Sequence, residues 1–166
     1  MRWTPERAAT WQAEQPWRVG CNFIPSNAIN QLEMWQAETF DPATLARELD
    51  LAANLGFNSL RVYLHDQLWR DSAGLLKRLD AFLKLTWERG MTVMLVFFDS
   101  CWANQSYLGP QPTPVPGMHN SGWLQSPAAK FFVFGSAEHW AFLEAYVKGV
   151  MEAFKDDDVG LLQRAR

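Results

Sequence analysis

Carboxylates, a histidine and a tryptophan stand where apolar stretches of the sequence end. Asp99 and Trp102 follow the apolar run 91–98, and His65 and Asp66 come directly after a shorter run. A carboxylate beside an indole suits a saccharide, because the carboxylate accepts hydrogen bonds from ring hydroxyls while the indole stacks on the C–H face of the sugar. The structural alternative is that Asp99 caps the loop and Trp102 closes the top of the fold.

Three residues in and after the shorter run each have more than one interpretation. Arg61 lies inside this run, residues 58–64. A charge within an apolar strand needs a partner, so Arg61 either forms a salt bridge or serves a site. His65 could bind a sugar hydroxyl or a metal, or it could form a surface or capping pair with Asp66. Because adjacent parallel strands lie about 4.8 Å apart, Asp66 and Asp99 could also form a catalytic pair, although most such pairs are structural or bind sugar.

The same rim is expected to hold further polar and aromatic side chains from strand ends and long loops. These are Asn22, Trp35, His119, Asn120 and Trp123. Clusters of this kind either bind a ligand or hold the shape of their loop, and both interpretations stay open.

Three helices and three strands must position these residues. Helical patterns begin at Asp41-Pro42, near Asp71-Ser72 and near Ser136, and the first two end at glycines. Strand-length apolar runs at residues 18–24, 58–64 and 91–98 alternate with the helices. The last run shows no polar alternation, as expected for a strand covered on both faces. The order predicts an α/β fold built on parallel strands.

Two long connections, residues 25–40 and 99–135, follow strand ends and carry several of the tryptophans. Function in α/β folds is concentrated at this side of the sheet. The chain has nine Trp and is 14% aromatic, more than a small core requires, so part of this surface is expected to bind a flat partner.

Composition argues against several other classes of function. The net charge of -3, without a basic cluster, argues against nucleic acid, and no apolar stretch approaches the roughly 20 residues that span a bilayer. No secretory signal is visible, so we expect a cytoplasmic protein. Cys21 and Cys101 lack zinc-ligand spacing, and we expect both to be reduced thiols. We expect neither a metal nor a cofactor.

Four segments resemble a known family. They are "WRVGCNFIPSNAINQLEMWQAETFD", "LGFNSLRVYLHD", "VFFDSCW" and "PGMHNSGWLQSP". Together they are similar to the N-terminal half of a bacterial group of clan A (β/α)8-barrel glycoside hydrolases. This group is cellulase-like, similar to glycoside hydrolase family 5 and often labelled 1,4-beta-xylanase. The resemblance runs from about residue 3 to about residue 158.

The resemblance implies a retaining glycosidase whose two catalytic carboxylates lie about 5 Å apart. In the clan these are a Glu in an Asn-Glu motif ending the fourth strand and a Glu ending the seventh, and this sequence contains no Asn-Glu pair. Arg61 matches the clan's strand-borne Arg, which contacts the nucleophile and helps keep it ionised. The implied ligand is a β-linked poly- or oligosaccharide, and we expect no hydrolysis by this chain alone.

The length of the chain agrees with a partial barrel, because a complete barrel takes about 250 residues and this chain has 166. We expect residues 1–166 to form three to four βα units of an incomplete TIM (β/α)8 barrel, with a stub of a fourth strand at 159–162. A truncated or frameshifted product would explain the ending. The alternatives are a non-catalytic carbohydrate-binding half-barrel, a half-barrel completed by a second chain, and another barrel enzyme with His65, Asp66 and Asp99 on a metal. Open sheet edges also predict self-association.

Overall fold

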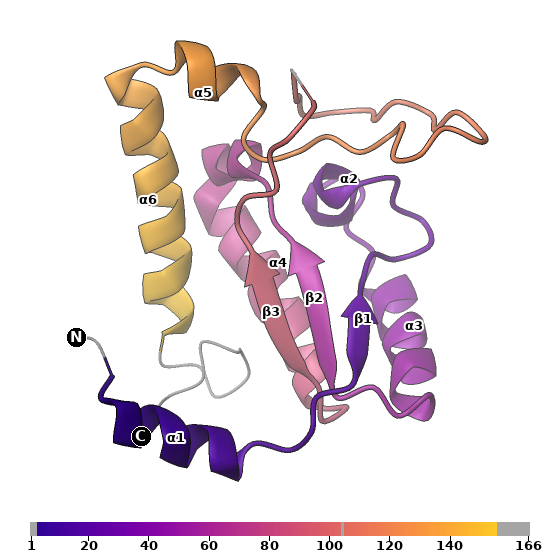
Figure 1. Cartoon of the computed structure of the whole chain (residues 1–166). Coiled ribbons are helices and arrows are strands. Elements are labelled where there is room, and N and C mark those ends of the chain that lie inside the picture. The colour runs from indigo at the N-terminus through magenta and orange to yellow at the C-terminus, as the bar shows by residue number, and fades with distance from the viewer. Residues whose placement is uncertain (1–2, 104, 156–166) are drawn as a thin grey trace.

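A three-stranded parallel sheet lies at the centre of the computed structural model, which describes residues 3–103 and 105–155. Its strands are β1 (Gly20–Asn22), β2 (Ser59–Tyr63) and β3 (Thr92–Val96), in the order β1-β2-β3 (Figure 1). The α/β class with parallel strands is therefore confirmed. The expected strand stub at 159–162 lies outside the described residues.

Three long helices follow the strands in chain order and begin at the expected caps. They are α3 (Pro42–Asn54), α4 (Ser72–Trp87) and α6 (Ala137–Phe154). The side chains of Asp41, Asp71 and Ser136 accept hydrogen bonds from backbone N–H groups in the first turns, which satisfies donors that the helix leaves free.

Four shorter elements were not expected from the sequence. They are α1 (Pro5–Glu14), α2 (Gln31–Trp35), the 3-10 helix η1 (Asp66–Asp71) and α5 (Lys130–Phe134). Two are helices of five residues, too short to show a helical period. The first has no buried residue, although Thr4 caps it and proline follows.

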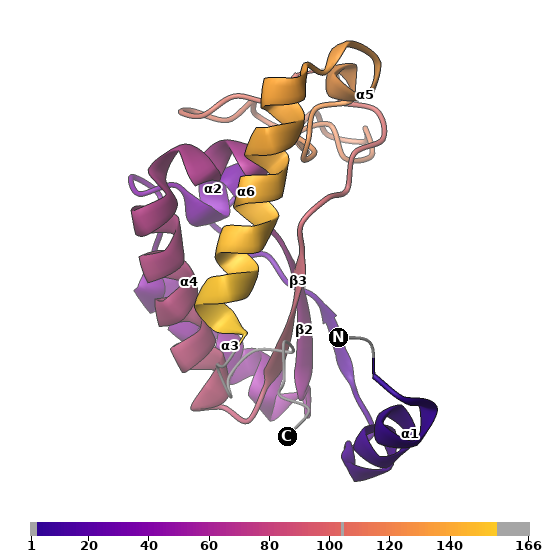
Figure 2. The same ribbon diagram turned by 90° about the vertical axis from the view of Figure 1, so that its left-hand side faces the viewer.

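The helices α3, α4 and α6 cover one face of the sheet, and the opposite face carries none of the three (Figure 2). Burial alternates along β2 accordingly: Leu60 and Val62 are buried beneath the helices, while Arg61 between them is exposed. The long segment between β3 and α6 lies beyond the carboxyl ends of the strands (Figure 1).

The register of the sheet sets two polar residues side by side. Gly20 pairs with Ser59, and Asn22 pairs with Arg61. A Cβ on Gly20 would lie 1.6 Å from the carbonyl oxygen of Ser59, so only glycine allows β1 to approach this closely. Within the part of the chain that the structure describes, no helix is long and apolar enough to cross a membrane.

Candidate functional site

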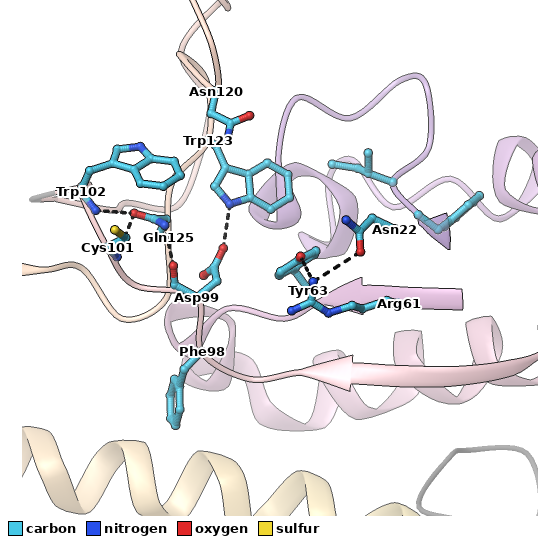
Figure 3. Close-up of a pocket in the computed structure, with 12 residues that line it drawn as sticks. Asn22, Arg61, Tyr63, Phe98, Asp99, Cys101, Trp102, Asn120, Trp123 and Gln125 are labelled. Atoms are coloured by element: carbon cyan, nitrogen blue, oxygen red, sulfur yellow. Dashed lines mark hydrogen bonds between the residues drawn. The ribbon is translucent and has the colours of Figure 1, made fainter. Parts of the chain in front are cut away.

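A cavity of about 420 Å³ opens at the carboxyl ends of the three strands (Figure 3). It brings together six of the residues singled out in the sequence: Asn22, Arg61, Asp99, Trp102, Asn120 and Trp123. They come from two strands, from the start of the 99–135 connection and from its second half. Its size and its mixture of aromatic and polar side chains are typical of a small-molecule site.

Arg61 projects from the uncovered face of β2 and forms one wall. Its Nη1 donates to the Tyr63 hydroxyl at 2.5 Å and lies 3.5 Å from Asn22 Oδ1. The guanidinium also lies 4.8 Å from the centroid of the Tyr63 ring, a cation–π contact. No acidic group of the described residues forms an ion pair with it. The salt-bridge interpretation of Arg61 therefore does not apply within this part of the chain.

Asp99 stands at the opposite wall, with both carboxylate oxygens engaged. Oδ2 accepts from the indole N–H of Trp123 at 2.7 Å, and Oδ1 accepts from the backbone N–H of Ser126 at 2.8 Å. The amide of Gln31 adds a third contact at 3.5 Å. These bonds tie the far end of the long connection to the end of β3. Asp99 therefore has the loop-holding role that the sequence left open, while still lining the cavity.

Two indoles face the cavity from different segments. Trp102 is 52% exposed. Trp123 is half-buried, and its ring meets that of Tyr63 edge to face, with centroids 5.4 Å apart. Asn120 turns the chain just before Trp123 with a φ of 53°, a left-handed conformation that asparagine tolerates. One indole is thus fixed and the other presents a free face.

Three expected site residues lie elsewhere. Trp35 is fully buried in the core, where its Nε1 donates to the carbonyl oxygen of Tyr63 at 2.9 Å. Its ring is packed against other aromatic side chains, so placing it on a ligand-binding rim was wrong. His65 is also fully buried, and His119 is exposed; neither lines the cavity.

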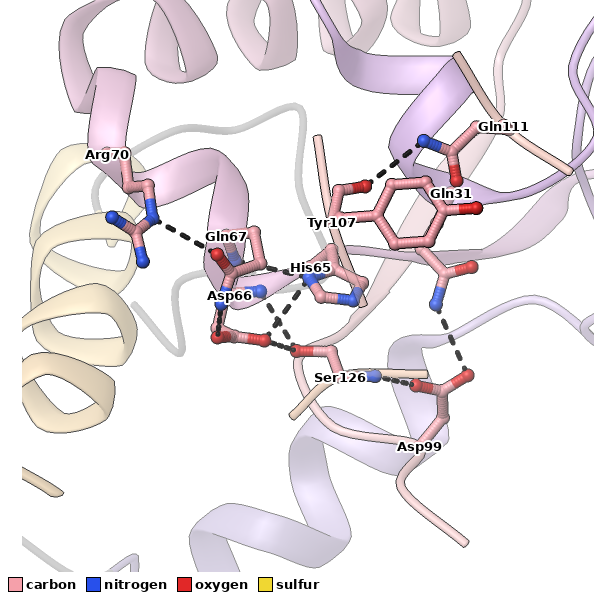
Figure 4. A network of polar contacts seen from close by, with 9 residues as sticks. All are labelled: Gln31, His65, Asp66, Gln67, Arg70, Asp99, Tyr107, Gln111 and Ser126. Atoms are coloured by element: carbon pink, nitrogen blue, oxygen red, sulfur yellow. Dashed lines mark hydrogen bonds and ion pairs between the residues drawn. The ribbon is translucent and has the colours of Figure 1, made fainter. Parts of the chain in front are cut away.

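His65 belongs to a buried network of polar contacts with Asp66, Gln67 and Ser126 (Figure 4). Its Nδ1 lies 3.2 Å from Asp66 Oδ1 and 3.1 Å from the backbone N of Gln67. The hydroxyl of Ser126 donates to Asp66 Oδ1 at 2.8 Å and accepts from the backbone N–H of Asp66 at 2.9 Å. Burial tends to raise the pKa of Asp66, but the adjacent His65 side chain and hydrogen bonds from Ser126 and Gln67 outweigh it, so the pKa lies below its usual value.

The structure does not form two of the alternative sites considered from the sequence, the catalytic pair of Asp66 and Asp99 and the metal site. Asp66 is fully buried and does not line the cavity, and Asp99 is held by three donors. The two do not present a pair of accessible carboxylates to a ligand. Nor do the described residues contain any group of three or more His, Cys, Asp or Glu side chains arranged to hold a metal ion, so the metal site on His65, Asp66 and Asp99 is not formed.

Sequence reasoning missed several residues that line the cavity. Tyr63 lies two positions after Arg61 on the same strand and therefore faces the same side, a signal that the strand period provides. Gln125 had no such signal, because its place depends on the path of an irregular loop. The remaining lining residues are Phe23, Ile24, Phe98 and Cys101.

Comparison with known proteins shows the fold. No family model matches the chain, and no curated protein matches it. Among solved structures, it is similar to GH5_18 from Streptomyces cattleya, determined in complex with GlcNAc, with a TM-score of 0.57 and 19% identity. It is also similar to the exo-beta-1,4-mannosidase Op5Man5 from Opitutaceae bacterium strain TAV5, with a TM-score of 0.55 and 24% identity.

The similarity covers most of this chain and a minor part of each solved structure. It takes in 87% of this chain and 32% of the Streptomyces protein, and 86% of this chain and 23% of the mannosidase. The chain therefore spans about a third or less of the length of these barrels. Its fold is similar to part of the fold of these two solved structures.

Proposed function

We propose that this chain forms the carbohydrate-binding part of a retaining glycoside hydrolase that acts on β-linked poly- or oligosaccharides. The observation that carries the proposal is the cavity at the strand ends, which combines two indoles with polar side chains in a fold similar to that of glycoside hydrolases. A saccharide ring has apolar C–H faces and a rim of hydroxyls, and the cavity offers partners for both.

Residues from each wall of the cavity would contact the sugar. Trp102 supplies a free aromatic face on which a sugar ring stacks. Asn22 and Asn120 offer amide donors and acceptors for hydroxyl groups. Arg61, which has no acidic partner within the described chain, donates to a sugar oxygen or to a carboxylate from another part of a complete barrel.

The proposal assigns both catalytic carboxylates to polypeptide that this chain does not contain. A retaining mechanism needs two carboxyl groups about 5 Å apart on either side of the scissile bond. Asp99 is the single carboxylate among the described residues that line the cavity, and its oxygens are occupied by loop donors. The isolated chain should therefore bind saccharide without hydrolysing it.

A non-catalytic carbohydrate-binding half-barrel is the second candidate. The engagement of Asp99 favours it, because a cavity without a free carboxylate can recognise sugar but cannot cleave it. Co-expression with a barrel half that supplies the missing strands separates the two: gain of hydrolysis supports the enzyme, and unchanged binding without hydrolysis supports the binding module.

We propose that the saccharide bound by this chain has β-1,4 linkages. The resemblance in the sequence favours cellulose- or xylan-type chains, and one structural neighbour is named an exo-beta-1,4-mannosidase. The test is a fluorescence titration of the chain with cellotetraose, xylotetraose and mannotetraose, followed by an assay on aryl β-glycosides. We expect saturable binding of at least one tetraose and no turnover. Turnover by the isolated chain would refute the assignment of the carboxylates, and no binding of any sugar would refute the carbohydrate function.

A further inference from the structure

We propose that Gln125 is a positioning residue, which holds Trp102 at the cavity so that its indole can receive a saccharide. The inference deepens the proposed carbohydrate function and rests on it. Gln125 lies in the connection between β3 and α6, and its side chain is almost fully buried at 2% exposure. No pattern in the sequence distinguishes it from the other glutamines.

The amide of Gln125 serves four backbone groups of one short segment. Its Oε1 accepts from the backbone N–H groups of Cys101 at 3.1 Å, Trp102 at 2.8 Å and Ala103 at 3.1 Å. Its Nε2 donates to the carbonyl oxygen of Asp99. A single side chain therefore fixes both ends and the middle of the segment that carries Trp102 (Figure 3).

The segment needs this support because it leaves the sheet without entering a helix. β3 ends at Val96, and residues 99–103 have no strand or helix ladder to pair their backbone groups. Three successive N–H groups that converge on one point require an acceptor there, since a backbone donor left without a partner is unfavourable. The amide oxygen supplies that acceptor, and the amide nitrogen supplies the one donor that a carboxylate would lack.

A reciprocal set of bonds fixes the second indole. The Asp99 carboxylate accepts from the indole N–H of Trp123 and from the backbone N–H of Ser126, and the Asp99 backbone N–H donates to the Ser126 carbonyl oxygen at 2.9 Å. The two segments are thus bonded to each other. Gln125 binds the backbone around Trp102, and Asp99 binds the indole of Trp123. Removal of Gln125 would free one indole and leave the other in place.

Another glutamine of similar character provides a matched control. Gln36 is buried at 6% exposure and also clamps the 99–135 connection, because its Oε1 accepts from Gly109 N and its Nε2 donates to Gly109 O at 3.2 Å. It does not line the cavity. Gln36→Leu therefore removes a comparable clamp from the same connection without touching the Trp102 segment.

The experiment compares Gln125→Leu, Gln125→Glu and Gln36→Leu in the full chain, by titration with the tetraose that the wild-type chain binds best. We expect Gln125→Leu to weaken binding by about tenfold, because the freed segment must be ordered again on binding. Gln125→Glu keeps the acceptor for the three N–H groups and should recover most of the affinity. Gln36→Leu should bind within about twofold of wild type. Equal affinities for Gln125→Leu and Gln36→Leu would overturn the inference.

A second measurement needs no ligand and separates this inference from the proposed function. Acrylamide quenching is compared for Gln125→Leu with and without Trp102→Phe. The inference predicts that Gln125→Leu increases quenching and that the increase disappears when Trp102 is absent. An increase that persists without Trp102, or no increase, would overturn it. If no tetraose binds the wild-type chain, the carbohydrate function fails, and quenching alone decides the role of Gln125.

Discussion

Trp35 and Trp102 share a sequence setting but have different surroundings. Both follow a strand in a long connection, yet Trp35 is fully buried and Trp102 is 52% exposed. Trp35 ends the short helix α2, and its ring meets that of Phe82 edge to face, with centroids 5.3 Å apart. Trp35 therefore packs in the core, whereas Trp102 lines the cavity.

Alanine substitutions should separate these two roles. Trp35→Ala removes a packed core ring and should lower the free energy of unfolding by about 3–5 kcal/mol. Trp102→Ala removes a half-exposed ring and should change it by about 0.5 kcal/mol or less, while abolishing most saccharide binding. Urea unfolding and sugar titration of both variants measure the two effects. A stable Trp35→Ala chain would contradict the assignment of Trp35 to the core.

The buried carboxylate of Asp66 should make stability depend on acid pH. Its pKa is lowered in the folded chain, so its contribution is fully present above the unfolded value of about 3.9 and is lost as the pH falls through the lower folded value. We expect Asp66→Asn to lower the free energy of unfolding by about 1–3 kcal/mol at neutral pH, with the deficit shrinking below about pH 4.

Urea unfolding of the wild-type and Asp66→Asn chains across this pH range provides the measurement. Asp80→Asn is a matched control, since Asp80 lies on the outer side of α4 and pairs only with Lys84 among the ion pairs seen, at 2.7 Å. It should change stability little at any pH. A deficit for Asp66→Asn that does not vary with pH would show that the Asp66 charge does not contribute.

At the scale of elements, the sequence was informative where a pattern repeats over several turns. The helices α3, α4 and α6 could be predicted because their caps and apolar stripes agree. The short helices α2 and α5 could not, since one turn shows no period. Half of the residues that line the cavity were expected from strand ends and from the long connections. The position of Gln125 and the burial of Trp35 depend on how these connections fold back, which no local pattern records.

The close approach of β1 to β2 supplies a prediction at this scale. Gly20→Ala would place a methyl group against the Ser59 carbonyl oxygen, so β1 must shift and carry Asn22 away from Arg61. We expect a lower melting temperature and weaker sugar binding. Cys21→Ala, at the next position of the same strand, should leave both nearly unchanged. Calorimetry and titration test this pair, and equal behaviour of the two variants would contradict the role of Gly20.

At the scale of the whole molecule, the sheet of the described chain is open at both edges. The sheet has three strands, and the outer edges of β1 and β3 have no strand partner within the described residues. The face opposite the helices exposes apolar side chains such as Met94, which is 50% exposed. Open edges and apolar faces are sites at which chains associate.

We therefore predict that the isolated chain self-associates. Sedimentation velocity over a range of protein concentrations should show species larger than a 19.0 kDa monomer that grow with concentration. Met94→Lys should reduce the association, because it places a charge on the uncovered face. A monomer with a cooperative melt at all concentrations would show that the open edges do not drive assembly.

We expect the cavity at the strand ends to bind saccharide through Trp102. Isothermal titration calorimetry of the 166-residue chain with β-1,4-linked tetraoses tests it most directly. The expected result is saturable heat with at least one of them and loss of that heat in Trp102→Ala, whose fold is verified by circular dichroism. Absence of binding in the folded wild-type chain, or undiminished binding in Trp102→Ala, would contradict it.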